Sequence, residues 1–364
     1  MKITIVAGAR PNFMKIAPII AAIEEQAGLG KSISYRLVHT GQHYDKNLSD
    51  TFFEELNIPK PHSNLEVKSG SQAQQTGAIM ERFEEEISIN KPDIVLVVGD
   101  VTSTMACAIV AKKAHVDVVH VEAGIRSGDR KMPEEINRIV TDSITDYFYT
   151  TTKEASQNLL DIGMKKEQVF LVGNVMIDTL LGNLHRLKKP IFWDEYNLSE
   201  RGYYVMTLHR PSNVDQATDL TALIDVIMKR AGDKPVIFPV HPRTLKMLEN
   251  LELFHKNLHF VAPQGYLSFI YLIKNAFAVL TDSGGITEET TMLNVPCLTF
   301  RDSTERPETC VLGTNRLVGQ DINLIEEAFD DLLSNKWPLA QEINLWDGKA
   351  ADRIVQSLTS LYEA

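Results

Sequence analysis

The sequence AVLTDSGGITEETTML, at residues 278–293, contains the pattern from which we predict the fold. Its apolar start predicts a short buried strand, and its second half predicts a helix with Glu288 and Glu289 in the first turn. Between them lie Gly284 and Gly285, and paired glycines permit unusual backbone conformations and a close approach by a ligand. The N-terminus of the next helix then suits a phosphate. A tight strand-to-helix turn without a ligand explains the same pattern, so both interpretations stay open here.

The same alternation of strand and helix extends over almost the whole chain. Apolar runs rich in β-branched residues predict strands at residues 3–7, 35–39, 94–98, 116–121, 147–150, 169–172, 203–207, 236–240, 258–261, 277–280 and 296–300. Amphipathic segments of helical length include residues 15–25, 72–87, 105–114, 134–145 and 153–160. Continuously apolar strands joined by helices are typical of a parallel sheet covered on both faces. We therefore predict an α/β protein with two Rossmann-like, doubly wound parallel-sheet domains.

The chain of 364 residues is longer than one typical domain. Residues 188–202 are polar with scattered aromatic residues, and they lack the periodicity of a helix or a strand. We therefore expect a linker or crossing segment there. The predicted domains are an N-terminal Rossmann-like domain at residues 1–173 and a C-terminal Rossmann-like domain at residues 174–349. A final helix at about residues 350–364 is expected to pack back on the first domain. Ligands of such sheets bind beyond the carboxyl ends of the strands, so we expect the active site in the interdomain cleft.

Composition argues against several classes of partner. The net charge of −11 disfavours nucleic acid and anionic membrane surfaces. No apolar run approaches the roughly 20 residues of a membrane helix, and the apolar N-terminal stretch is too short for a signal peptide. Three cysteines without a C-x-x-C spacing are expected to be reduced thiols of a cytoplasmic protein. Of these, Cys107 and Cys297 lie in apolar surroundings that predict the core, whereas Cys310 does not.

Carboxylates follow the central strands of the first predicted domain. Asp100 and Glu122 each come directly after a buried apolar run, and Glu134 lies in the first turn of the next helix. Asp100 has an alternative role as a helix cap, and Glu134 has one as the partner of Arg138 in a surface ion pair. The neighbouring Glu135 fits an ordinary helix start. Three carboxylates at one edge of a sheet would suit proton transfer.

Two cations follow the first strand. Arg10 lies in the turn and Lys15 in the first turns of the helix, so both can point at an anion above the sheet or simply be solvated. The absence of a G-x-G-x-x-G pattern, and of an acid at the end of the second strand, disfavours a nicotinamide cofactor. The loop after the second strand carries Gln42 and His43, which can contact a ligand or belong to the surface.

Polar and aromatic residues follow the strands of the second predicted domain. His209 ends the first of these strands and is a candidate acid, base or phosphate partner. The other residues that could form a nucleotide site are His241, Arg243, Gln264, Tyr266, Phe269, Ser283, Gly284, Gly285, Arg301, Glu305, Arg306 and Glu308. They offer a glycine turn, a helix N-terminus, an aromatic side chain, an acid for a ribose and an arginine for a phosphate.

The chain resembles a known family, the non-hydrolysing UDP-N-acetylglucosamine 2-epimerases, in nine segments. In chain order these are GARPNFMKIAP, TGQHYD, VVGDVTST, HVEAGIRSGDRKMPEEINR, VGNVMID, TLHRPSN, PVHPR, TDSGGITEE and RDSTERPE. They extend from Gly8 to about Gly319, which is nearly the whole chain. Each segment alone is a weak signal, but their combination in this order is highly specific.

The resemblance implies a glycosyltransferase-B architecture, a homodimer, and a reaction without a metal or a nicotinamide cofactor. The implied reaction converts UDP-N-acetylglucosamine to UDP-N-acetylmannosamine by anti elimination of UDP to 2-acetamidoglucal, followed by re-addition. By motif, the implied catalytic residues are Asp100, Glu122, Glu134 and His209. The implied substrate-binding residues are Arg10, Lys15, Arg138, Gln264, Phe269, Ser283, Gly284, Gly285, Glu289 and Arg306. Gln42, His43 and His241 lie in loops through which substrate activates some members allosterically, although Asp45 breaks the Gln-x-x-Gln pattern of that control.

Two departures from the family pattern bear on the choice of sugar. Ala9 and Asn12 replace the Thr and the Glu of the usual G-T-R-P-E loop. Pro211 and Ser212 occupy the third and fourth positions of the usual H-R-x-E-N. The matched cations and acids stay in place. The alternatives to the implied reaction are an epimerase of a modified UDP-sugar such as a UDP-diacetamido uronic acid, a hydrolysing epimerase, a glycosyltransferase of the same fold, and a catalytically silent UDP-sugar sensor.

Overall fold

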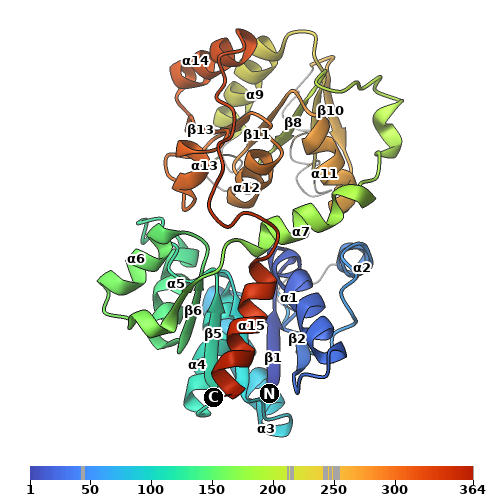
Figure 1. The fold of residues 1–364 in the computed structure, drawn as a ribbon. Coiled ribbons are helices and arrows are strands. Elements are labelled where there is room, and N and C mark those ends of the chain that lie inside the picture. The colour runs from blue at the N-terminus through green and yellow to red at the C-terminus, as the bar shows by residue number, and fades with distance from the viewer. Residues whose placement is uncertain are drawn as a thin grey trace. The chain divides into compact units, whose positions relative to one another are not determined.

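The structure is a computed structural model that describes residues 1–41, 46–210, 213, 217–240, 245, 248 and 255–363. The chain divides into two compact units. Unit 1 consists of Met1–Asn183 with Asn344–Ala364, and unit 2 consists of Leu184–Ile343. Figure 1 shows that each unit is a sheet with helices packed around it.

Unit 1 contains a seven-stranded sheet in the order β3-β2-β1-β4-β5-β6-β7, with every pair of neighbours parallel. Its strands are β1 (Lys2–Ala7), β2 (Ser34–His39), β3 (Ser63–Asn64), β4 (Ile94–Val98), β5 (Asp117–Val121), β6 (Tyr147–Thr150) and β7 (Val169–Leu171). Its helices are α1 (Arg10–Gly28), α2 (Lys46–Glu55), α3 (Gln72–Ile89), α4 (Thr102–Lys113), α5 (Pro133–Ile144), α6 (Lys153–Asp161), α7 (Val175–Asn183) and α15 (Ala350–Glu363). All residues of β4 are buried, because helices cover both faces of a central parallel strand.

Unit 2 contains a six-stranded parallel sheet in the order β10-β9-β8-β11-β12-β13. Its strands are β8 (Tyr204–Thr207), β9 (Val236–Pro239), β10 (Leu258–Val261), β11 (Ala278–Thr281), β12 (Cys297–Thr299) and β13 (Asn315–Leu317). Its helices are α9 (Ala217–Ala231), α11 (Tyr266–Asn275), α12 (Gly284–Met292), α13 (Pro307–Val311) and α14 (Ile322–Leu333). Residues of α9 and α14 such as Ile224 and Phe329 pack on Phe238 and Leu280 of the sheet to form one apolar core.

The two sheets share one strand order. In each unit the chain starts at a central strand, proceeds to one edge, and then returns to fill the other side. The direction reverses between β1 and β4 in unit 1 and between β8 and β11 in unit 2. Ligands of doubly wound sheets bind beyond the carboxyl ends of the strands at this reversal. The predicted fold class, two Rossmann-like doubly wound parallel sheets, is confirmed.

Several elements differ from the sequence-based expectation. The sequence does not predict β3 and β13, because their short segments SN and NRL are not apolar runs. Helix α1 begins at Arg10 rather than at residue 15, because the side chain of Asn12 closes its first turn. The Asn12 Oδ1 atom accepts the N–H groups of Gly8 at 3.0 Å and Ala9 at 3.1 Å, and its amide donates to the carbonyl of Val98 at 3.1 Å. This departure from the family loop is therefore a packing residue.

The segment at residues 188–202 packs on unit 2 instead of forming a bare linker. Its Trp193 is buried and lies edge-on to Tyr203 at 5.4 Å and Tyr271 at 5.3 Å between ring centroids. At the other end of the chain, α15 packs on α1 and α7 of unit 1. Its Ala351 N–H donates to the Asp178 carboxylate of α7 at 2.7 Å.

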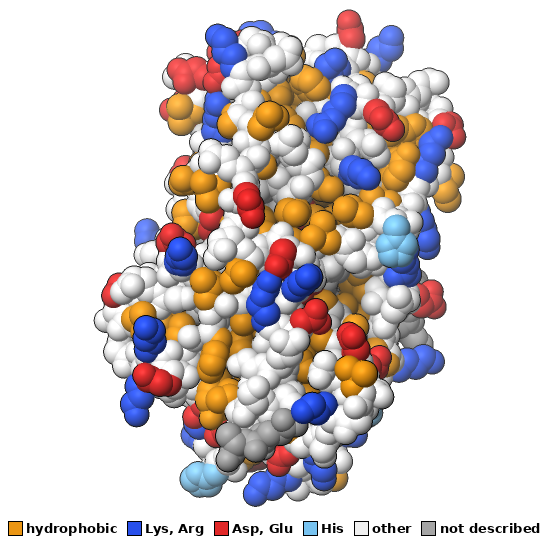
Figure 2. Space-filling view, in the orientation of Figure 1, with side chains coloured by type: hydrophobic (Ala, Val, Ile, Leu, Met, Phe, Trp, Pro, Cys, Tyr) orange, Lys and Arg blue, Asp and Glu red, His pale blue; other side chains and the backbone are white. Residues whose placement is uncertain are grey.

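The surface and the cysteines agree with the composition. Figure 2 shows acidic and basic side chains interspersed with apolar ones on the face drawn. Cys107 and Cys297 are buried free thiols, as predicted, and Cys310 is a partly buried free thiol. Among the helices that the structure describes, none is long and apolar enough to cross a membrane.

Candidate active site

Adjacent strands of unit 1 bring Asp100 and Glu122 to one edge of the sheet. The register of β4 and β5 places Gly99 opposite Glu122 just beyond the last paired residues, and Asp100 follows Gly99. Glu122 is buried and forms an ion pair with Lys15 of α1, which is itself buried. A Cβ atom on Gly99 would lie 2.7 Å from the Lys15 Nζ atom, so a larger residue here would displace the lysine amino group.

The backbone at this edge is unusual at the carboxylate itself. Glu122 has a φ angle of 67°, a left-handed conformation that a residue with a side chain rarely adopts. Gly99 opposite it also has a positive φ, of 66°. Such conformations cost on the order of 1–3 kcal/mol and occur where the surrounding structure fixes them, often at functional sites. The turn after β5 therefore holds the Glu122 side chain in a defined place.

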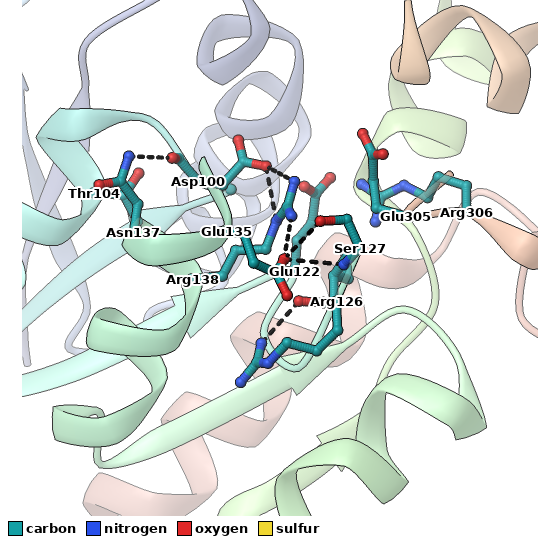
Figure 3. Close-up of polar contacts among 12 residues, drawn as sticks. Asp100, Thr104, Glu122, Arg126, Ser127, Glu135, Asn137, Arg138, Glu305 and Arg306 are labelled. Carbon is teal, nitrogen blue, oxygen red and sulfur yellow. Dashed lines mark hydrogen bonds and ion pairs between the residues drawn. The ribbon is translucent and has the colours of Figure 1, made fainter. Parts of the chain in front are cut away.

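Asp100 binds Arg138 of α5. The carboxylate accepts the Nε atom of Arg138 at 3.0 Å and its Nη2 atom at 2.6 Å (Figure 3). The cap position of α4 is Val101, so Asp100 lies one residue before it. The arginine also contacts Glu135, whose Oε2 atom accepts Arg138 Nη1 at 2.7 Å.

Glu135 is a structural residue, as its place in the first turn suggests. Its carboxylate accepts the N–H groups of Ser127 at 2.9 Å and Gly128 at 3.1 Å, besides the bond from Arg138 (Figure 3). Burial is the largest influence and would raise the pKa of Glu135, but these hydrogen bonds and the charge of Arg138 hold it below the usual value. Glu135 therefore stays ionised and ties the charged loop after β5 to α5.

Glu134 lies apart from this network. Its side chain is exposed, and Arg138 pairs with Asp100 and Glu135 instead, so the predicted surface ion pair of Glu134 with Arg138 is wrong. Glu134 lines a cavity of about 320 Å³ together with residues at the starts of α3, α4 and α5. The lining residues are Ser69, Gly70, Gln72, Gln75, Val101, Thr102, Pro133, Glu134 and Asn137. Glu134 is thus a solvent-accessible carboxylate.

In unit 2, His209 stands at the end of β8 against a buried acid. Its Nδ1 atom lies 2.7 Å from the Asp282 Oδ1 atom, while 63% of the His209 side chain is exposed. Asp282 also accepts the N–H groups of His209 and Arg210 and the amide of Asn213. Burial is the largest influence and would raise the pKa of Asp282, but His209 and these donors lower it. Asp282 thereby orients the imidazole and directs its Nε2 atom outward.

Helix α12 begins at Gly284, so the two glycines are its first residues and not a separate turn. Neither has a positive φ angle, and Glu288 and Glu289 lie in the second turn rather than the first. Ser283, at the cap position, makes no side-chain capping bond, which leaves the first N–H groups of α12 without that partner. A Cβ atom on Gly285 would meet nothing within 4 Å, so the helix start is open at this residue.

The other side of the helix start is occupied. A Cβ atom on Gly284 would lie 2.6 Å from Glu305 Oε1 and 3.3 Å from Arg301 Nη1. Arg301 also pairs with Glu305, with 2.6 Å between Nη2 and Oε2. Within the described part of the chain, the buried Nη1 atom of Arg301 has no hydrogen-bond partner. In the structure, the side chains of Glu305 and Arg301 therefore occupy this side of Gly284.

Two consecutive acids of α12 are buried in different environments. Glu288 pairs with Arg306, with 2.5 Å between its Oε1 atom and the arginine Nε atom. Glu289 is buried beside it and faces the Tyr266 hydroxyl, and its Oε1 atom has no hydrogen-bond partner among the described residues. Burial, and then the charge of Glu288, raise the pKa of Glu289 to about 8. Glu289 is therefore a neutral carboxyl group at neutral pH.

The remaining predicted site residues are only partly placed. Gln264 is half-buried and donates to the carbonyl of Ala262 at 2.7 Å. Phe269 is half-buried in the first turn of α11, so it belongs to a helix and not to a loop. The side chain of Arg10, and the possible allosteric residues Gln42, His43 and His241, lie outside the described part of the structure. Among described residues, no cluster of three His, Cys, Asp or Glu side chains could hold a metal ion.

The structure adds one residue that the sequence does not single out for the site. Asp282 is buried behind His209, and its position directly after a buried strand is a usable signal, like that of Asp100. Arg301 is among the residues predicted for the nucleotide site, but its contact with Gly284 could not be predicted, because it depends on the fold of the loop after β12.

Comparison with solved structures first defines the class of fold. A UDP-GlcNAc 2-epimerase of Methanocaldococcus jannaschii in complex with UDP-GlcNAc and UDP has a TM-score of 0.88 at 41% identity, with 99% of this chain and 100% of that chain covered. The enzyme of Neisseria meningitidis bound to UDP-GlcNAc has a TM-score of 0.89 at 30% identity, over 99% and 100% of the chains. The outer core galactosyltransferase WaaB shares the fold alone, with a TM-score of 0.55 at 14% identity over 98% and 100%. The architecture is therefore glycosyltransferase-B-like.

Sequence comparison then defines the family. A model of the family described as UDP-N-acetylglucosamine 2-epimerase matches residues 27–359. The UDP-N-acetylglucosamine 2-epimerase of M. jannaschii is 41% identical over 99% of both chains. The UDP-2,3-diacetamido-2,3-dideoxy-D-glucuronate 2-epimerase of Pseudomonas aeruginosa is 39% identical over 99% of this chain and 100% of that protein. The chain belongs to the UDP-N-acetylglucosamine 2-epimerase family, a family of isomerases, which confirms the resemblance seen in its motifs.

Proposed function

We propose that this protein interconverts UDP-N-acetylglucosamine and UDP-N-acetylmannosamine without releasing free sugar. The proposal is supported by membership of the family and by a relative that carries this name at 41% identity over 99% of both chains. The observation that carries it is the pair of strand-end carboxylates in unit 1. Asp100 and Glu122 lie on adjacent strands, and each is held by its own cation, Arg138 and Lys15 respectively.

The C2 proton of such a sugar has no neighbouring carbonyl, so direct deprotonation is very difficult. In the proposed elimination a carboxylate takes the C2 proton while the C1–O bond breaks, and UDP leaves with the bonding electron pair. The products are 2-acetamidoglucal and UDP, both held by the enzyme. Return of a proton to the other face of C2, with attack of the UDP oxygen on C1, gives the epimer. Two carboxylic groups with different proton occupancy suit this sequence.

Asp100 and Glu122 are the groups that we propose for these proton transfers, with exposed Glu134 as the third candidate. The charge of Lys15 offsets that of buried Glu122, and removing either partner would leave an uncompensated charge. Arg138 likewise fixes the Asp100 carboxylate through two hydrogen bonds. The two carboxylates are thus held by separate cations.

Unit 2 is proposed to bind UDP. The open N–H groups at the start of α12 and the unused Nη1 atom of Arg301 offer charge to a diphosphate. In the structure Glu305 lies against Gly284, so a diphosphate at this place requires that carboxylate to move away. We propose Glu289 as the ribose ligand and His209, oriented by Asp282, as the partner of the departing phosphate oxygen. Gln264 and Phe269 are proposed on the uracil side.

A product analysis tests the function directly. Purified protein is incubated with UDP-N-acetylglucosamine alone, and the products are followed by proton NMR. The expected result is an equilibrium mixture of the two UDP-sugars. Free UDP and 2-acetamidoglucal should appear only as traces, from intermediates that escape the enzyme. Accumulation of free N-acetylmannosamine and UDP would indicate a hydrolysing epimerase. An unchanged substrate would indicate a glycosyltransferase that needs an acceptor, or a UDP-sugar sensor.

A second substrate is favoured by one comparison. The diacetamido-glucuronate epimerase of P. aeruginosa is almost as similar as the N-acetylglucosamine enzymes, at 39% identity. UDP-2,3-diacetamido-2,3-dideoxy-D-glucuronate is therefore tested beside UDP-N-acetylglucosamine at equal concentration. A larger kcat/KM for the diacetamido sugar would assign the protein to that reaction. The elimination chemistry and the residues of both units would stay the same.

Dimer formation and allosteric control remain predictions. The homodimer implied by the family is checked by light scattering of the purified protein. Activation through Gln42, His43 and His241 predicts that rates with UDP-N-acetylmannosamine as the sole substrate depend sigmoidally on its concentration. Hyperbolic rates that UDP-N-acetylglucosamine does not raise would contradict such control.

A further inference from the structure

A histidine inside the sheet of unit 1 contacts the two turns that carry the proposed acids. His120 is the fourth residue of β5, and its side chain is fully buried. Its Nε2 atom lies 2.8 Å from the carbonyl oxygen of Gly99, and its Nδ1 atom lies 2.7 Å from the Asp142 Oδ1 atom of α5. Both ring nitrogens thus face an oxygen atom.

The partners fix the protonation of the ring. The Gly99 carbonyl can only accept, so Nε2 carries a proton. The other oxygen of Asp142 accepts the N–H of Gly124 at 3.1 Å and the Nη1 atom of Arg126 at 2.6 Å, which is the pattern of an ionised carboxylate. Burial is the largest influence and would raise the pKa of Asp142, but His120 and Arg126 together lower it. Because Asp142 is ionised, Nδ1 also donates, and the ring is an imidazolium.

The two hydrogen bonds of the ring reach the two strand ends. Gly99 is the residue before Asp100, and its own N–H donates to the carbonyl of Val121, the residue before Glu122. Through Asp142 the ring also holds the N–H of Gly124, two residues after Glu122. One buried ion pair therefore ties the turn after β4 to the turn after β5.

We propose that His120, as an imidazolium held by Asp142, is a positioning residue that fixes Asp100 and Glu122 relative to each other for the two proton transfers. A buried charge pair is costly, and an apolar side chain would pack into a strand at lower cost. The pair persists here because Gly99, with its positive φ, offers a carbonyl that an apolar side chain would leave unsatisfied. The inference rests on the proposed function, since it assigns the role of a residue in that reaction.

Two substitutions separate the two hydrogen bonds. Asparagine places its amide nitrogen near Nδ1, so His120→Asn keeps the bond to Asp142 and loses the one to Gly99. Glutamine reaches the position of Nε2, so His120→Gln keeps the bond to Gly99. We expect kcat of His120→Asn to fall on the order of 10- to 100-fold, as for other residues that orient a reacting group, with His120→Gln losing less. Affinity for UDP should be unchanged in both, because the proposed UDP ligands belong to unit 2.

A matched control uses the exposed His115, whose backbone φ of 58° asparagine tolerates. His115→Asn should behave like the wild type in kcat and UDP affinity. An unchanged kcat in His120→Asn, or a drop in UDP affinity as large as the drop in kcat, overturns the positioning role. A wild-type protein that does not epimerise UDP-N-acetylglucosamine overturns the proposed function instead, so the two failures are distinguishable.

The protonation is tested without any variant. Nitrogen-15 labelling of the 10 histidines allows the ring N–H groups to be observed by NMR. We expect one ring with two slowly exchanging, downfield N–H protons and imidazolium nitrogen shifts. A histidine with these buried neighbours that shows only one ring proton overturns the inference, even if the His120 variants do not fold.

Discussion

The two units have the same strand order, yet the acids of their candidate sites have different partners. In unit 1, Glu122 is paired with Lys15 and Asp100 with Arg138. In unit 2, Glu288 takes Arg306, and the adjacent Glu289 is left with a raised pKa of about 8. The same fold thus places acids in two electrostatic environments. They differ in whether a cation reaches the carboxylate.

The difference matches the division of labour that we propose. A group that moves protons has to be held rigidly in a defined charge state, and the paired acids of unit 1 fulfil this requirement. A group that binds ribose hydroxyls meets its partner only when the ligand arrives. Glu289, buried without a partner for Oε1 among described residues, has the features of such a waiting ligand. The following changes test this contrast, beginning with the largest expected effect.

Replacing Glu122 with glutamine should lower kcat on the order of 10³-fold, because a general acid or base contributes about 10²- to 10⁴-fold. The affinity for UDP, measured by calorimetry, should stay the same, since the proposed UDP ligands belong to unit 2. The matched control is Glu85→Gln on the exposed face of α3, which should leave kcat unchanged. A Glu122→Gln enzyme with full activity would remove Glu122 from the proton transfers.

Replacing Lys15 with methionine should lower the free energy of unfolding of unit 1 by about 3 kcal/mol, because Glu122 is left buried with an uncompensated charge. The double variant Lys15→Met/Glu122→Gln should recover most of this loss. Lys112→Met, which breaks the partly exposed pair with Asp146, should cost about 0–1 kcal/mol. Urea unfolding measures all three. Equal losses at Lys15 and Lys112 would contradict the contrast between the paired acids and ordinary surface charges.

The raised pKa of Glu289 predicts that ligand binding expels a proton. Below about pH 8 the carboxyl group is protonated and has to ionise to accept two ribose hydroxyls. Affinity should therefore rise about tenfold per pH unit towards pH 8 and level off above it, since one pKa unit is 1.36 kcal/mol. Calorimetry uses the Glu122→Gln protein, whose turnover should be slower on the order of 10³-fold. Its ligand is UDP-N-acetylglucosamine, which has no terminal phosphate that titrates in this pH range.

The same titration in a Glu122→Gln/Glu289→Gln background isolates this effect from His209. The slope of the affinity against pH gives the number of protons released on binding. This number should differ by one between the two backgrounds. Equal slopes would show that Glu289 does not titrate on binding, and the contrast between the units would then rest on unit 1 alone.

Asp178 of α7 provides a smaller test within unit 1, because it is buried beside the start of α15 rather than paired with a cation. Burial is the main cause that raises its pKa to about 6, while the N–H groups of α15 oppose the shift. A raised folded-state pKa means that stability is gained as pH falls through 6 and is lost above it. Asp178→Asn keeps the acceptor for Ala351 and should raise the free energy of unfolding at about pH 8 by about 2 kcal/mol.

At about pH 4 the Asp178→Asn variant and the wild type should be equally stable, because the carboxyl group is protonated in the folded state. Thermal unfolding at both pH values makes the comparison. Asp178→Ala, which loses the acceptor as well, is the control and should be less stable at both. A variant stabilised equally at both pH values would show that burial does not raise the pKa of this acid.

The fold could be predicted because its strands are continuous apolar runs, which local sequence reveals. Much of the candidate site could also be predicted, because an acid such as Asp100 or Glu122 directly after a buried apolar run is easily recognised. The predicted turn at Gly284 and Gly285 was wrong. Two glycines resemble a turn in sequence, but here both adopt an ordinary helical backbone and are the first residues of the helix.

Long-range pairing could not be predicted. Arg138 lies four residues from Glu134 on the same helix, yet it pairs with Asp100, 38 residues away. His120 appears in the sequence as one polar residue within an apolar strand, and nothing local indicates that Asp142 and Gly99 meet it. Such contacts depend on the order of the strands in the sheet, which brings distant turns to the same edge.

Proton exchange at C2 is the event that connects the acids of unit 1 to the reaction. Wild-type protein is incubated in D2O with UDP-N-acetylglucosamine, and proton NMR follows the C2 position of both UDP-sugars. We predict that the UDP-N-acetylmannosamine formed carries deuterium at C2, and that the Glu122→Gln protein incorporates deuterium on the order of 10³-fold more slowly. Epimerised product that retains its original C2 proton would contradict proton transfer by Asp100 and Glu122.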